Sequence, residues 1–111
     1  MPTYEEVLDT IKPNLKSGEH VVGAVVGAVA GEAFHTVLAL TSQRVMVLRG
    51  GSASILELSN LASVSWAPAW ARLNIDLKVP RKRMVVAVFG SEWKLKAKEF
   101  AEAAKRLGAK D

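Results

Sequence analysis

The alternation of apolar and polar residues is clearest between Arg72 and Val79. Four apolar residues alternate there with four polar ones: Leu73, Ile75, Leu77 and Val79 against Arg72, Asn74, Asp76 and Lys78. A period of two places the apolar side chains on one face of an extended chain, so the pattern predicts a half-buried β-strand. Six further runs rich in branched residues predict strands at about 21–29, 34–40, 44–49, 54–58, 62–66 and 84–89.

Turn and breaker residues separate these runs. A polar Thr41-Ser42-Gln43-Arg44 step predicts a hairpin between the second and third strands. Pro68 is expected to end the fifth strand, because proline has no N–H for a neighbouring strand. A basic turn, Pro80-Arg81-Lys82-Arg83, is expected before the seventh strand, with mobile, solvated side chains. Gly23 and Gly27 in the first run indicate bends or a close approach of two backbones.

Helical patterns flank the strands. Thr3 and Glu6 fit a capping box and Pro13 cannot continue a helix, so we expect a short helix from about Tyr4 to Ile11. Ser91 is the expected N-cap of a second helix. Its apolar residues recur at steps of three and four: Trp93, Ala97, Phe100, Ala104 and Leu107. That spacing predicts an amphipathic helix with one buried face.

The order of seven short strands and one amphipathic helix resembles the pleckstrin-homology (PH) superfamily, in which the helix closes one end of a bent sheet. Three motifs point to one branch: Ser17-Gly18-Glu19, Leu40-Thr41-x-x-Arg44 and Leu58-x-x-Leu61-x-x-Val64. With Trp93 and Phe100 on the last helix, they resemble the bacterial PH-like domains of the YokE type over residues 15–107. Ser42 departs from the Asp or Asn that this branch often has.

The resemblance implies a fold and a binding role. The implied fold is mainly β, a seven-stranded bent sheet or partly open barrel with a C-terminal amphipathic helix and a short N-terminal helix. Relatives that bind phosphoinositides carry basic residues between their first two strands. The corresponding segment here, Ala30-Gly31-Glu32-Ala33, holds one acidic and no basic residue, so phosphoinositide binding is not expected.

Length and composition fit one domain over residues 1–111. The chain has no cysteine, which excludes disulfides and thiol chemistry. Its amphipathic start, with Glu5, Glu6 and Asp9, is unlike a secretory signal. The longest apolar run, Val21 to Ala30, is half of the roughly 20 residues that a membrane helix needs. We therefore expect a soluble, cytoplasmic protein.

Residue patterns for catalysis are lacking. His20 and His35 have no ligand spacing, and no Gly-x-Ser-x-Gly elbow or phosphate-binding glycine loop occurs. We expect a protein that is not an enzyme and that needs no cofactor or metal.

Positive charge is concentrated in the second half of the chain. The net charge is +4, and residues 56–111 hold eleven basic and six acidic side chains. The candidate ligand-binding residues are Trp70, Arg72, Lys78, Arg81, Lys82 and Arg83. Such residues could contact lipid or nucleic-acid phosphates. For Arg81, Lys82 and Arg83 we favour the simpler interpretation of a charged hairpin tip that keeps the turn soluble and blocks unwanted edge pairing.

Three functions stay open on this basis. The first and most favoured is a protein interaction or self-association module, expected to form a homo-oligomer through sheet edges and exposed apolar residues such as Trp70. The second is peripheral binding to anionic membranes through the basic hairpin 81–83. The third and least favoured is nonspecific binding of nucleic acid by the same residues.

Overall fold

The computed structural model describes residues 3–29, 35–49, 52–57, 63–69, 72–79 and 82–107. Its elements are α1 (Tyr4–Ile11), the 3-10 helix η1 (Lys12–Asn14), β1 (Val21–Ala28), β2 (His35–Thr41), β3 (Arg44–Arg49), β4 (Ser52–Glu57), β5 (Ser63–Ala69), β6 (Arg72–Val79), β7 (Lys82–Val88) and α2 (Ser91–Arg106). The strands form one antiparallel sheet in the order β4-β3-β2-β1-β7-β6-β5.

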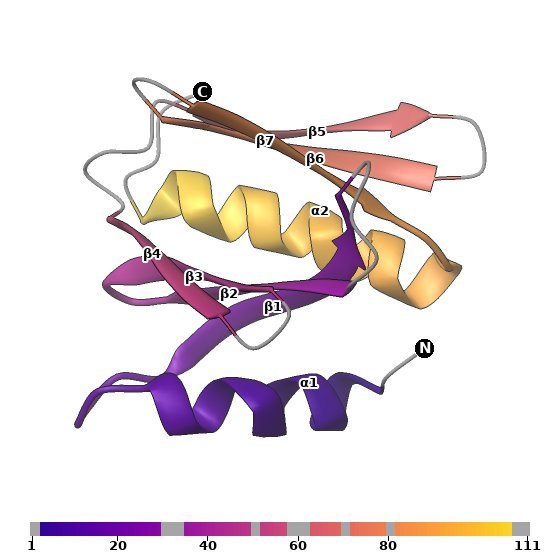
Figure 1. The fold of residues 1–111 in the computed structure, drawn as a ribbon. Helices are drawn as coiled ribbons and strands as arrows, with labels where there is room; N and C mark the ends of the chain where they lie inside the picture. Colours follow the sequence, from indigo (N-terminus) through magenta and orange to yellow (C-terminus); the bar gives the residue numbers. More distant parts are fainter. Residues whose placement is uncertain are drawn as a thin grey trace.

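This sheet consists of two half-sheets that are joined at one place. β1 to β4 pair as consecutive hairpins, and so do β5 to β7, whereas β1 and β7 pair only at Ala28 and Ala87 within the described ranges. Figure 1 shows α2 between the two half-sheets and α1 on the outer side of the β1–β4 half. The sheet is bent but not closed, so β4 and β5 are its edges. The predicted fold, mainly β and consistent with a PH-like domain, is confirmed.

Helix α2 supplies the centre of the core. Trp93 and Phe100 are buried, as their spacing predicted, and Ala97 and Ala104 lie on the same buried face. β1 passes close to this helix at Gly23, where a Cβ atom would lie 3.6 Å from the Cα of Phe100. Because both half-sheets turn apolar side chains toward α2, the helix covers two surfaces that would otherwise face water.

A second glycine allows the half-sheets to meet. A Cβ atom on Gly27 would lie 2.5 Å from the carbonyl oxygen of Ala87 and 2.6 Å from Cγ1 of Val86. Any larger residue there would push β1 away from β7, next to the Ala28–Ala87 pair. The predicted close approach of backbones is confirmed at Gly27.

Helix α1 has the predicted bounds and start. The Thr3 hydroxyl accepts a hydrogen bond from the Glu6 amide at 3.2 Å, and the Glu6 carboxylate accepts one from the Thr3 amide at 3.1 Å. Val7 and Ile11 are buried and fix the helix to the β1–β4 half-sheet. The capping box therefore gives the backbone amides of both Thr3 and Glu6 a hydrogen-bond partner.

Several predicted boundaries were wrong. β5 continues through Pro68, which pairs with Leu73, and ends at Ala69; an edge strand tolerates proline because one side of it has no partner strand. β7 begins at Lys82, so Lys82 and Arg83 belong to a strand and not to a turn. The N-cap of α2 is Gly90, at φ +86°, and Ser91 is the first helical residue.

Candidate functional site

The predicted basic residues do not converge within the described part of the chain. Arg72 and Lys78 are both exposed on the outward face of β6, six residues apart, which corresponds to about 20 Å along a strand. Trp70 and Arg81 lie outside the described residues. Of Lys82, only the backbone placement in β7 is described, opposite Val79.

Arg83 is held by a carboxylate on the neighbouring strand. Its Nε donates to Asp76 Oδ2 at 2.9 Å and to Oδ1 at 3.1 Å, and its Nη2 also donates to Oδ2. The Arg83 side chain is exposed, as predicted for a solvated residue, but it is held in place and not mobile, because the longer β7 brings it within reach of Asp76 on β6. The ion pair also reduces the positive charge that this surface offers to an anion.

The structure also places two further tryptophans and the two histidines of the chain. Trp93 is buried, as expected, whereas Trp66 is only half-buried and has the Lys98 ammonium 4.9 Å from its ring centroid. His20 and His35 are both exposed, next to or at the start of a strand. None of these side chains lies in a cluster that resembles a catalytic site.

A buried ion pair explains two of the sequence motifs. Arg44 donates to Glu19 through Nε and Nη2, both at 2.9 Å, and Nη2 also donates to the Asn14 carbonyl at 2.9 Å. The Thr41 hydroxyl donates to Glu19 at 2.6 Å and accepts from the Arg44 amide at 3.1 Å. The Gly18-Glu19 turn and the Thr41–Arg44 hairpin are thus tied together, with both charged side chains buried.

The electrostatics of this ion pair follow from its geometry. Hydrogen bonds from Arg44 are the main reason that the pKa of Glu19 is lowered to about 2, against the opposing effect of burial. The same bonds raise the pKa of Arg44. The side chains of Glu19, Thr41 and Arg44 bond to one another, so we infer that this cluster stabilises the fold.

The edge strand β4 is the most accessible part of the sheet. It pairs with β3 along its whole length, from Ser52 opposite Arg49 to Glu57 opposite Arg44. Five of its six residues are exposed, including Ile55 at 41%. It contains no proline or lysine, the residues that commonly protect an edge strand, and its one charge is Glu57 at the end.

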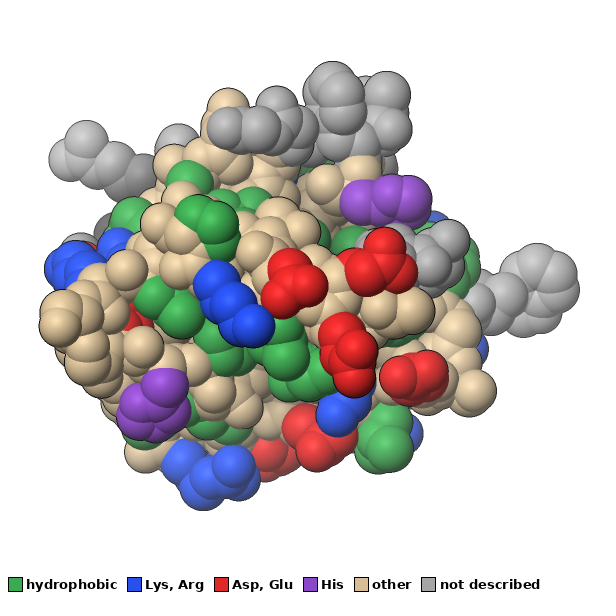
Figure 2. Space-filling model, turned by 90° about the horizontal axis from the view of Figure 1, so that it is seen from below, with side chains coloured by type: hydrophobic (Ala, Val, Ile, Leu, Met, Phe, Trp, Pro, Cys, Tyr) green, Lys and Arg blue, Asp and Glu red, His purple; other side chains and the backbone are tan. Residues whose placement is uncertain are grey.

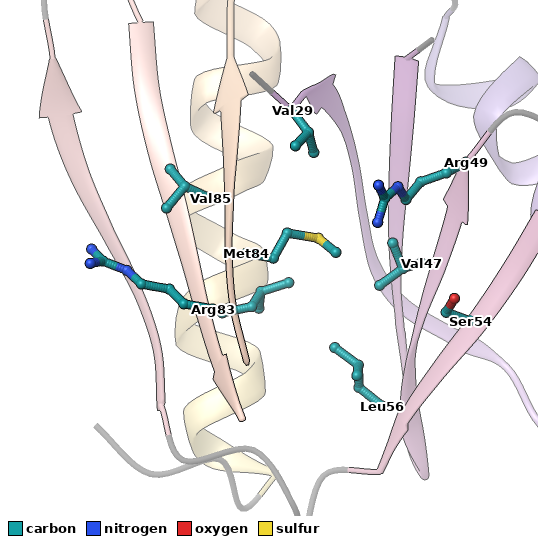
Figure 3. Close-up of a pocket in the computed structure, with 9 residues that line it drawn as sticks. Val29, Val47, Arg49, Ser54, Leu56, Arg83, Met84 and Val85 are labelled. Atoms are coloured by element: carbon teal, nitrogen blue, oxygen red, sulfur yellow. The ribbon is translucent and has the colours of Figure 1, made fainter. Parts of the chain in front are cut away.

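A cavity of about 510 Å³ lies behind β4, between the two half-sheets. One wall comes from β3 and β4, the other from β6 and β7, and Val29 lies beside them (Figure 3). The lining residues are Val29, Val47, Arg49, Ser54, Leu56, Leu77, Arg83, Met84 and Val85. Because Ser54 and Leu56 line this cavity, the alternation of a strand turns Ile55 to the opposite face.

The sequence analysis expected assembly through sheet edges, but it did not identify β4 as the open edge, and it missed the cavity. The alternation of Val47 with Arg49 and of Ser54 with Leu56 could have placed these residues on common faces. Which face encloses a cavity depends on how the two half-sheets meet, and the residues of β3 and β4 do not determine that.

Charge is also distributed unevenly over the surface. Figure 2 views the molecule from the side of α1 and shows several acidic side chains gathered on this face. Glu5, Glu6 and Asp9 of α1 are all exposed there. The described basic residues of β6, Arg72 and Lys78, lie on the other half-sheet.

No protein-family model matches the sequence, and no curated protein matches it. Among the described residues, no helix combines the length and the apolar character needed to cross a membrane.

Proposed function

We propose that this protein is a non-enzymatic PH-like binding module, related to the YokE-type domains, that self-associates through the edge of β4. The observation that carries the proposal is an exposed six-residue edge strand without proline or lysine. A strand of this kind offers unpaired N–H and C=O groups to a second strand, and Ile55 adds an exposed apolar side chain.

A symmetric pairing of two β4 strands has a defined register. A twofold axis perpendicular to the sheet keeps each face on its own side, so paired residues must belong to the same face. With the axis at Ile55, this residue meets Ile55 of the other copy, and Ser54 meets Leu56. Glu57 then lies opposite Ala53, which keeps the two carboxylates apart.

The second edge is less suited to pairing. β5 carries Pro68, which removes one donor from its backbone. The outward face next to it holds the exposed charges of Arg72 and Lys78. Assembly through β4 therefore gives a closed dimer and not an open chain of molecules.

The anionic-surface alternative receives less support from the described residues. Arg83 is already paired with Asp76, and Arg72 and Lys78 lie far apart on β6. Binding of membranes or nucleic acid by the hairpin 81–83 remains a prediction that vesicle and DNA titrations at low salt would check. We also propose a cytoplasmic location for the self-associating module.

Sedimentation equilibrium tests the assembly. We expect the wild type to be a dimer at high micromolar concentration at both low and high salt, because the pairing uses backbone groups and apolar contact. Ile55→Lys should be monomeric and remain folded, since surface substitutions usually change stability by less than about 0.5 kcal/mol.

Val22→Lys is the matched control, because Val22 is 42% exposed but lies at the bulge of the central strand β1. This variant should stay dimeric. A monomeric wild type, or dissociation by both lysine variants to the same extent, would overturn assembly through β4.

A further inference from the structure

The cavity between the half-sheets has the size of a small-molecule site, and its lining changes from polar at the surface to apolar inside. Its volume of about 510 Å³ lies within the range of roughly 300–1,000 Å³ that is usual for ligand pockets. Val47 and Leu77 line it and are buried, so they form its floor. Ser54 lines it and is exposed, so it lies at the mouth. A ligand that enters beside Ser54 therefore ends against hydrocarbon.

Three apolar side chains of the lining are only partly covered by the protein itself. Val29, Leu56 and Met84 pack against the core but are half-buried. A ligand that covers their exposed parts removes hydrocarbon from water, which favours binding. The described lining offers no aromatic ring for stacking, and the unbranched Met84 adapts its shape easily. An aliphatic ligand body therefore matches this cavity better than an aromatic one.

The charged side chains of the described lining have partners of their own. Arg83 binds Asp76, and its guanidinium points away from the cavity (Figure 3). Arg49 also has an interaction partner. A charged ligand would have to compete with these partners, whereas an uncharged ligand needs only a hydrogen bond for its polar end. The hydroxyl group of Ser54 can donate or accept such a bond at the mouth.

We propose that this cavity binds an uncharged, medium-chain aliphatic alcohol or carbonyl compound, with its polar end at Ser54 and its chain between Leu56 and Met84. A sugar or a nucleotide fits less well, because its polar groups would face hydrocarbon without partners. This binding function goes beyond self-association and does not depend on the pairing of β4.

Chain length gives the first test. Titration calorimetry of the full chain with hexanol, octanol and decanol should show affinity rising about fourfold for each buried methylene. Equal affinities for the three alcohols, or no detectable binding of decanol, would overturn the proposal.

The two ends of the ligand are tested separately. A second hydroxyl, in 1,10-decanediol, should weaken binding at least about fivefold relative to decanol, because the floor at Val47 and Leu77 has no polar side chain to receive it. Decanoate should bind no more tightly than decanol, because the lining arginines have partners of their own. Equal binding of the diol, or tighter binding of decanoate, would contradict an uncharged ligand with one polar end.

A substitution in the wall tests the location. Met84→Gln should weaken decanol binding at least about fivefold, because it places an amide without a partner beside the alkyl chain. Leu8→Gln is the matched control, because Leu8 is a half-buried apolar residue of α1 outside this cavity. It should leave the affinity unchanged, and urea unfolding checks that both variants are folded. Unchanged affinity in Met84→Gln, or an equal loss in both variants, would overturn the proposed site.

A measurement on the wild type needs no substitution. With methyl-labelled methionine, decanol should shift the signal of Met84, which lines the cavity, and leave that of Met46 in place. Met46 neighbours Val47 but points to the opposite face and is fully buried. A shift of Met46 alone would overturn the assignment. So would a shift of Met84 caused by phosphatidylcholine vesicles without decanol, because it would point to membrane lipid as the source of the chain.

Discussion

Replacing Glu19 by Gln should destabilise the protein at neutral pH and change how its stability depends on acid. Glu19 accepts hydrogen bonds from Arg44, Thr41 and the Lys16 amide, and its side chain is fully buried. Removing one partner of a buried ion pair leaves the other charge without compensation, which costs about 3–5 kcal/mol. We expect a loss of this size for Glu19→Gln at pH 7.

The sign of the pH effect follows from the pKa of Glu19. It is about 2 in the folded protein and 4.5 for the unperturbed group, so the unfolded state binds more protons between these values. The stabilisation by the Glu19 carboxylate is fully present above about pH 4.5 and is lost as the pH falls toward 2. Between pH 6 and pH 3, its contribution should fall by about 2 kcal/mol.

Urea unfolding at pH 6 and pH 3 measures this effect. The difference in unfolding free energy between wild type and Glu19→Gln should be about 2 kcal/mol smaller at pH 3, because glutamine does not titrate. Glu99→Gln, which changes an exposed carboxylate on α2, should stay within about 0.5 kcal/mol of the wild type at both pH values. A Glu19→Gln difference that is the same at pH 6 and pH 3 would refute the reasoning.

Two further substitutions test the core. Phe100→Ala should cost about 3–5 kcal/mol in urea unfolding, because it empties the centre of the layer between the half-sheets; an unchanged midpoint would contradict that placement. Thr36→Val should stabilise the protein by about 1 kcal/mol, because the buried Thr36 hydroxyl has no hydrogen-bond partner within the described residues; a loss of stability would indicate that the hydroxyl is satisfied.

Local patterns were sufficient to predict most of the elements. The bounds of α1 follow from Thr3, Glu6 and Pro13, which act within a few residues of one another. Strand β6 was predicted with its observed bounds because the alternation from Arg72 to Val79 matches a strand with one buried face. Trp93 and Phe100 were predicted to be buried because apolar residues recur at helical spacing on one face of α2, and both are buried.

Interactions between distant segments could not be predicted in this way. Pro68 was expected to end β5, and only the position of β5 at the edge of the sheet makes the proline acceptable. Arg83 was assigned to a solvated turn because the sequence does not show that β7 starts at Lys82 and brings it to Asp76. The resemblance singled out the segments of Glu19 and Arg44, but their contact spans 25 positions of chain.

The placement of α2 has a consequence for the order in which the protein is made. Both half-sheets precede this helix in the chain, so they are synthesised with apolar inner faces that nothing yet covers. Each half consists of consecutive hairpins that can form locally, whereas the union of the halves waits for contacts between α2 and strands far back in the sequence. Until then the exposed faces favour aggregation. The 16-residue helix thus determines when the two half-sheets become one fold, as well as whether they do.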